Sequence, residues 1–104
     1  MPTSRIVTID AHPAVVFDSL LGVIEEQGLW VHMVDHARRQ VVVGRQGKPF
    51  RVSASVTDNG YGKSCMHFSW HPPTSGGGGK TAKRLEKQTS AWVRDRSMPP
   101  DAPG

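Results

Sequence analysis

The chain has 104 residues, of which 37% are hydrophobic, and a formal net charge of +4, with a sequence pI of about 9.7. This length suits one domain, which buries roughly 65% of its unfolded surface in a two-layer core. No apolar run approaches the roughly 18 residues of a membrane span, and the first residues lack the pattern of a secretory signal. We therefore expect a cytoplasmic chain without a transmembrane segment, in which the single cysteine, Cys65, forms no internal disulfide.

The first predicted elements are a short strand and an amphipathic helix. Arg5 to Asp10 is rich in β-branched residues, which is typical of a strand. Pro13 suits the first position of a helix, with Asp10 or His12 near the cap. From Ala14 to Gln27 apolar residues recur at spacings of three and four, and the glycine that follows suits a helix stop. This apolar stripe consists of Val16, Phe17, Leu20, Leu21, Val23 and Ile24.

The next segment, Leu29 to Asp35, alternates in the manner of a strand with two different faces. One face carries Leu29, Val31 and Met33, and the other carries Trp30, His32 and Val34. After a polar break at Asp35–Arg38 the strand resumes over Gln40 to Gly44. Trp30 is the one tryptophan that this pattern directs to the open polar face of the sheet.

Phe50 to Asp58 and Lys63 to His71 form the clearest predicted hairpin, around the turn signal Asn59-Gly60. The inward residues are Phe50, Val52, Ala54, Val56, Met66, Phe68 and Trp70. The outward residues are Arg51, Ser53, Ser55, Thr57, Cys65, His67, Ser69 and His71. Because only one face is apolar, we expect the helices to cover one side of the sheet and leave the other open.

The last predicted helix spans Lys80 to Arg96, and a Pro-rich tail over residues 97–104 is predicted to be disordered. The apolar stripe of this helix is thinner, with Ala82, Leu85, Thr89, Trp92 and Val93. Residues 1–96 are thus predicted to form a single α+β domain. Its fold class is a four-stranded antiparallel sheet in β-α-β-β-β-α order, with two helices packed on one face.

Gly79-Lys80-Thr81 is similar to the end of a nucleotide-binding loop, but the remainder of that motif is missing. The motif requires Gly-x4-Gly-Lys-Ser/Thr next to a strand, and Thr74 stands where the first glycine belongs. The pattern favours a flexible turn over Gly76 to Gly79. Anion binding by the helix N-terminus is the weaker alternative.

The histidines and the cysteine are the candidates for metal binding or catalysis. His67 and His71 share a predicted face with Cys65, and His32 and His36 lie four apart on another strand. Residues four apart on a strand are about 13 Å apart, so one strand cannot supply both as ligands of one metal ion. Neither an activated thiol nor a pair of carboxylates is evident. No catalytic residue, metal or cofactor is therefore predicted.

The chain resembles a small uncharacterised bacterial α+β family over about residues 5 to 95, in the runs Phe17–Leu21, Glu25–Asp35, Val41–Val43, Phe68–Trp70 and Gly79–Lys80. This resemblance implies the order strand, helix, three strands, helix, and it implies no activity. More distantly, Ile9 to Phe17 is similar to the opening strand and helix of helix-grip (START/Bet v1-like) domains, which bind lipids. This chain lacks the extra strands that enclose their cavity.

These observations predict a non-enzymatic accessory or binding domain and leave three interpretations open. The first is a protein-interaction module with an exposed patch at Trp30 and Val42, or a homodimer formed through a sheet edge. The second binds nucleic acid or an anionic surface through the basic last helix, for which a solvated helix face is the plainer account. The third holds an apolar ligand between helix and sheet. The candidate binding surface comprises Trp30, His32, Arg51, His67, Lys80, Lys83, Arg84 and Lys87.

Overall fold

The computed structural model describes residues 3–72 and 77–97, so the predicted tail lies outside the described residues from position 98 onward. Two helices and five strands follow one another along the chain. They are β1 (Ser4–Ile9), α1 (Pro13–Glu26), β2 (Trp30–Asp35), β3 (Gln40–Gly44), β4 (Arg51–Asp58), β5 (Ser64–His71) and α2 (Gly78–Ser97). Within the described ranges, neither helix combines the length and the apolar character needed to cross a bilayer.

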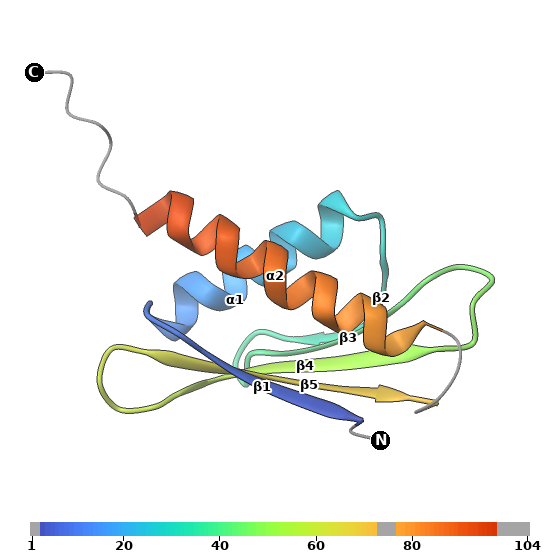
Figure 1. Ribbon diagram of the computed structural model, residues 1–104, viewed down its shortest axis with the longest axis horizontal. Helices are drawn as coiled ribbons and strands as arrows, with labels where there is room; N and C mark the ends of the chain where they lie inside the picture. The colour runs from blue at the N-terminus through green and yellow to red at the C-terminus, as the bar shows by residue number, and fades with distance from the viewer. Residues whose placement is uncertain (1–2, 73–76, 98–104) are drawn as a thin grey trace, which may run out of the picture.

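The strands form one antiparallel sheet in the order β1-β5-β4-β3-β2, and both helices lie on the same side of it (Figure 1). The predicted α+β class and helix placement are confirmed, but the predicted count of four strands was wrong. The polar break between the valine-rich segments is a chain reversal over residues 36–39, where Asp35 Oδ1 accepts a hydrogen bond from the backbone N–H of Arg38. Arg39 completes this turn with a φ of 53°. Strands β2 and β3 therefore pair side by side instead of forming one interrupted strand.

Helix α1 begins and ends at the positions that its local sequence indicates. His12 is the N-cap, and its Nδ1 accepts a hydrogen bond from the backbone N–H of Ala14. Gly28 follows the helix with a φ of 68°. The N–H of Leu29 then donates to the carbonyl oxygen of Ile24 at 3.2 Å, which satisfies one of the carbonyls left free at a helix end.

The core between the helices and the sheet is filled by side chains. Val16, Leu20 and Val23 of α1 have no accessible surface, and neither do Val43 and Val52 of the facing sheet. A side chain that lined a water-sized void would keep some accessible surface, so no such void lies against these residues. The remaining core residues are Ile9, Phe17, Ile24, Leu29, Val41, Phe50, Ala54, Val56, Met66, Phe68, Ala82, Leu85 and Val93.

Strand β2 does not follow the predicted alternation. Its register against β3 shifts between Val31 and Met33, which makes His32 the extra residue of a β-bulge. An extra residue reverses the faces that follow it, so Met33 joins Trp30 on the open face, while Val31 and Val34 lie on the helix side. The predicted faces of Met33 and Val34 were therefore wrong. The predicted exposure of Trp30 is confirmed, because 52% of its surface is accessible.

The glycines before the last predicted helix belong partly to that helix. Gly78 and Gly79 form the first turn of α2, and the Trp70 side chain packs against them. A Cβ added at Gly78 would lie 2.8 Å from the Trp70 Cβ, so only glycine allows this close approach. The predicted flexible turn was wrong for Gly78 and Gly79. Gly77 precedes the helix with a φ of 89°, and Gly76 lies outside the described residues.

Candidate functional site

The face of the sheet opposite the helices carries rows of side chains that run across the strands. Residues paired in an antiparallel register share a face, so the strand pairing defines each row. The first row is Asp35, Gln40, Ser55, His67 and Ile6; the second is Met33, Val42, Ser53, Ser69 and Ser4; the third is Trp30, Gly44, Arg51 and His71. Three of the five residues in the second row are serines, and their short side chains leave the centre of this face recessed relative to its surroundings.

A hollow of about 420 Å³ lies over the first two rows. We call it the open-face hollow. Short serine side chains occupy its centre, and the longer side chains of Ile6, Met33 and His67 rise around them. Its lining comprises Ser4, Ile6, Met33, Gln40, Val42, Ser53, Ser55, His67 and Ser69, together with Arg5, Val41, Ala54 and Phe68, which alternate with them along the strands.

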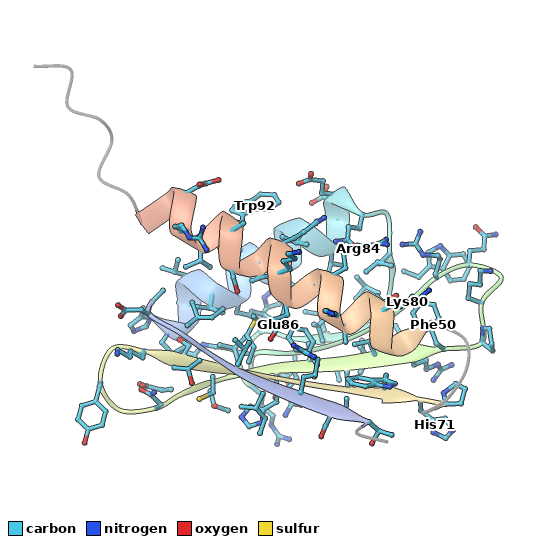
Figure 2. The ribbon with its side chains drawn as sticks, in the orientation of Figure 1. Phe50, His71, Lys80, Arg84, Glu86 and Trp92 are labelled. Atoms are coloured by element: carbon cyan, nitrogen blue, oxygen red, sulfur yellow. The ribbon has the colours of Figure 1, made fainter. Side chains whose placement is uncertain are left out.

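A smaller hollow of about 310 Å³ continues the open-face hollow toward the third row. The two share Val42, Ser53 and Ser69, and the smaller one adds Arg51 and His71 at its far end. Figure 2 shows His71 on the side of the sheet away from the helices. Together the two hollows offer an apolar surface, several hydroxyl groups, imidazole rings and the guanidinium of Arg51, and the described residues that line them include no carboxylate.

The eight residues predicted to form one binding surface lie on two separate surfaces. Arg51 and His67 line the hollows of the open face, and Trp30 and His32 lie beside them. The His32 ring covers Gly44, where an added Cβ would lie 2.7 Å from the His32 Nε2. Helix α2, which lies on the opposite side of the sheet, carries the basic residues Lys80, Lys83, Arg84 and Lys87. Binding at either surface stays a prediction.

The strand order keeps the predicted metal-ligand candidates apart. β3 and β4 lie between β2 and β5, so His32 is separated from Cys65 and His67. The ring of His36 instead packs edge-on against that of Phe17, with 6.0 Å between ring centroids. Among residues 3–72 and 77–97, no three His, Cys, Asp or Glu side chains lie together in a way that could hold a metal ion.

The sequence pattern placed Ser53, Ser55, Ser69 and His67 on the outward face but missed Ser4, Ile6 and Met33. Ile6 reaches the hollow because β1 pairs with β5, and a short first strand carries no signal for that partner. Met33 reaches it because of the bulge at His32. The pattern also missed the ion pair between Arg5 and Glu86, 2.8 Å apart, which joins β1 to α2.

No protein-family model matches the chain, and no curated protein sequence matches it. Among solved structures, the chain is similar to StfQ, a di-domain ARO/CYC from the steffimycin biosynthetic pathway, with a TM-score of 0.63 and 12% identity over 92% of this chain. It spans 45% of the StfQ chain. It is also similar to Ara h 8.0201, with a TM-score of 0.61 and 10% identity over 88% of this chain and 96% of that protein. These likenesses support the helix-grip (Bet v1-like) fold. The resemblance to a bacterial α+β family stays a prediction.

Proposed function

We propose that this chain is a binding domain that holds a small, mainly apolar molecule with one or more oxygen-bearing groups on the open face of its sheet. The observation that supports this proposal is the open-face hollow, whose volume is about 420 Å³. Sites for small molecules typically measure about 300–1,000 Å³. The hollow is therefore large enough for one ligand of this class.

The side chains of the hollow suit a ligand with an apolar body and polar substituents. Ile6 and Met33 are 66% and 43% exposed, and a ligand that covers them removes apolar surface from water, which stabilises the complex by about 25 cal/mol per Å². The serine hydroxyls between them can donate and accept hydrogen bonds. Arg51, at the far end of the adjoining hollow, supplies a cation for an acidic group.

The open face is a better place for this ligand than the space between helix and sheet. Val16 and Leu20 of α1 and Val52 of β4, which α1 contacts, have no accessible surface, so a ligand there would have to separate α1 from the sheet. Packed interiors resist such displacement because their contacts are lost together. The open-face hollow needs no rearrangement of the core.

The proposal is binding and not catalysis. The described residues that line the open-face hollow bring one imidazole, His67, among serine hydroxyls and no carboxylate. His67 and Cys65 alternate with Ser64 and Met66 along β5, and Cys65 Sγ lies 3.8 Å from Thr8 Oγ1 at a position outside the hollow. StfQ, which has a similar fold, is an ARO/CYC from a biosynthetic pathway. This supports the proposal that the ligand of this chain is a small molecule.

Titration of the ¹⁵N-labelled protein with fatty acids and with hydroxylated aromatic compounds tests the proposal. We expect saturable amide shifts at residues of the open face, above all Val42, Ser53 and Ser69, and little change in α1. The variant Ser53→Leu fills the centre of the hollow and should abolish these shifts. Thr57→Leu places the same side chain outward on the same strand, outside the lining residues, and should leave them intact.

Two results would contradict this proposal. Equal binding by Ser53→Leu and Thr57→Leu would mean that the hollow is not the site. Shifts concentrated at Leu20, Val43 and Val52 would place the ligand in the core between helix and sheet.

A second function, self-association through the sheet edge, is favoured by the exposure of β2. This edge strand displays four apolar side chains, Trp30, Val31, Met33 and Val34, which are between 41% and 52% exposed. Exposed edges with apolar side chains readily pair with another strand. Sedimentation analysis should then show a dimer that Val31→Lys disrupts, whereas Tyr61→Lys, at an exposed position between β4 and β5, should have no effect. A wild-type chain that stays monomeric at all concentrations would exclude this function.

A further inference from the structure

A separate hollow of about 490 Å³ lies between the connection from β3 to β4 and the start of α2. Figure 2 shows Phe50 and Lys80 close together at this end of the molecule, with Arg84 further along the helix. We call this hollow the basic groove. It is lined by Arg45, Lys48, Pro49, Phe50, Gly77, Lys80, Thr81 and Arg84, and it shares none of these with the hollows of the open face.

The basic groove gathers four cations and no carboxylate among the described residues that line it. Arg45 and Lys48 come from the β3–β4 connection, and Lys80 and Arg84 come from successive turns of α2. The ion pairs between described residues, Arg5 with Glu86 and Arg38 with Asp35, involve none of these four. A concave surface lined by one sign of charge focuses its potential and raises the local concentration of counter-ions.

We propose that the basic groove binds a small molecule through a diphosphate group. The cations lie on two opposite walls, so two linked phosphate groups can meet cations from both the loop and the helix. Guanidinium groups bind phosphate oxygens in a bidentate manner, and lysine provides a point charge. Pro49, which is exposed, adds an apolar surface on the loop side for the organic part of such a ligand.

The hollow favours a compact ligand over a nucleic acid backbone or a membrane surface. Lys83 and Lys87 lie on the same helix as Lys80 and Arg84, yet neither lines the groove. An extended polyanion would use the charges along the whole helix, whereas a small diphosphate uses the four cations around the hollow. The groove also differs from a nucleotide-binding loop, because Gly78 packs against Trp70 instead of wrapping a ligand.

Calorimetric titration with inorganic pyrophosphate at physiological ionic strength tests this proposal. We expect saturable binding that is at least about tenfold tighter than that of inorganic phosphate, since the second phosphate adds charge-assisted hydrogen bonds. The double variant Lys80→Gln with Arg84→Gln should weaken pyrophosphate binding by at least about tenfold. Arg45→Gln with Lys48→Gln, on the opposite wall, should do the same.

The double variant Lys83→Gln with Lys87→Gln is the matched control, since it removes the same charge from the same helix outside the groove. It should change pyrophosphate affinity by less than about threefold, which is the size expected of screened, long-range charge effects. Equal weakening by this control would overturn the proposal in favour of diffuse attraction. Absence of saturable pyrophosphate binding would overturn it as well.

Duplex DNA and phosphatidylcholine vesicles containing phosphatidylserine provide the remaining comparison. If either binds more tightly than pyrophosphate and loses affinity equally in the Lys80/Arg84 and Lys83/Lys87 variants, the whole helix face is the site and the proposal fails. If the loss is confined to the groove variants and pyrophosphate competes, the groove is the site. Amide spectra of each variant establish that it is folded.

Discussion

Gly78 and Gly79 sit side by side in the first turn of α2 but differ in the room around them. An alanine methyl at Gly78 would meet the Trp70 Cβ at 2.8 Å, whereas at Gly79 it would lie 3.4 Å from the nearest indole atom, an ordinary contact. We expect Gly78→Ala to lower the free energy of unfolding by about 1–3 kcal/mol, the usual cost of overpacking.

Gly79→Ala is the control for this prediction. Alanine is the better helix former by about 1 kcal/mol, so this variant should be as stable as the wild type or more stable. Urea denaturation of the two variants measures the difference. Equal effects of the two substitutions would show that helix propensity, and not contact with Trp70, governs this turn.

The same two glycines show what a short motif can and cannot reveal. The sequence argued against a nucleotide-binding loop at Gly79-Lys80-Thr81, because Thr74 stands where the first glycine of that motif belongs. The reason for the glycines could not be inferred, since it depends on Trp70, which the chain brings to the helix only after β5 has been placed in the sheet. The residues next to Gly78 and Gly79 in the sequence therefore do not predict the contact with Trp70.

At the level of the elements, α2 packs against the rest of the protein through a stripe that includes a buried hydroxyl group. Thr89 has no accessible surface, and its Oγ1 has no hydrogen-bond partner among the residues that the structure describes. An unsatisfied buried hydroxyl costs about 1–3 kcal/mol. Thr89→Val keeps the shape and removes the hydroxyl, so we expect it to raise the free energy of unfolding by about 1 kcal/mol.

Thr89→Ser separates the two parts of this side chain. It keeps the hydroxyl and removes a buried methyl group, which should lower stability by about 1 kcal/mol. Thermal denaturation of both variants provides the measurement. A destabilised Thr89→Val would mean that the hydroxyl has a favourable partner.

The elements that the sequence predicted best are those with local signals. Helix α1 has its apolar stripe, its cap at His12 and its stop at Gly28, and all three act within a few residues of the helix. Strands β4 and β5 alternate without interruption, so their two faces were predicted correctly. Strand β2 contains a bulge at His32, and nothing in its own residues distinguishes the bulged register from a regular one. The outward serines of β4 and β5 were therefore predicted, whereas Met33 was assigned to the wrong face and no hollow on the open face was predicted.

For the molecule as a whole, the packed core decides between two places for a ligand. It favours the open face of the sheet over the space between the helices and the sheet. Leu20 is fully buried between α1 and the sheet. We expect Leu20→Ala to lower the free energy of unfolding by about 2–5 kcal/mol, because it leaves a cavity in a packed interior. Leu21→Ala, at a half-buried position of the same helix, should cost less.

Xenon binding provides a second measurement of the same feature. Engineered apolar cavities stay dry and take up small apolar guests, so Leu20→Ala should bind xenon in its core. The wild-type protein should not show xenon-dependent amide shifts next to Leu20. Xenon-dependent shifts of the wild type at this position would reveal an internal void and return the ligand site to the space between helix and sheet.

The open-face hollow and the basic groove occupy opposite layers and have no lining residue in common. A molecule held in one touches nothing that holds a molecule in the other. Each ligand should raise the free energy of unfolding according to its own concentration and dissociation constant, so we expect simultaneous saturation to give the sum of the two increments in free energy. On these two proposals, the sheet separates two ligand sites that act independently of each other.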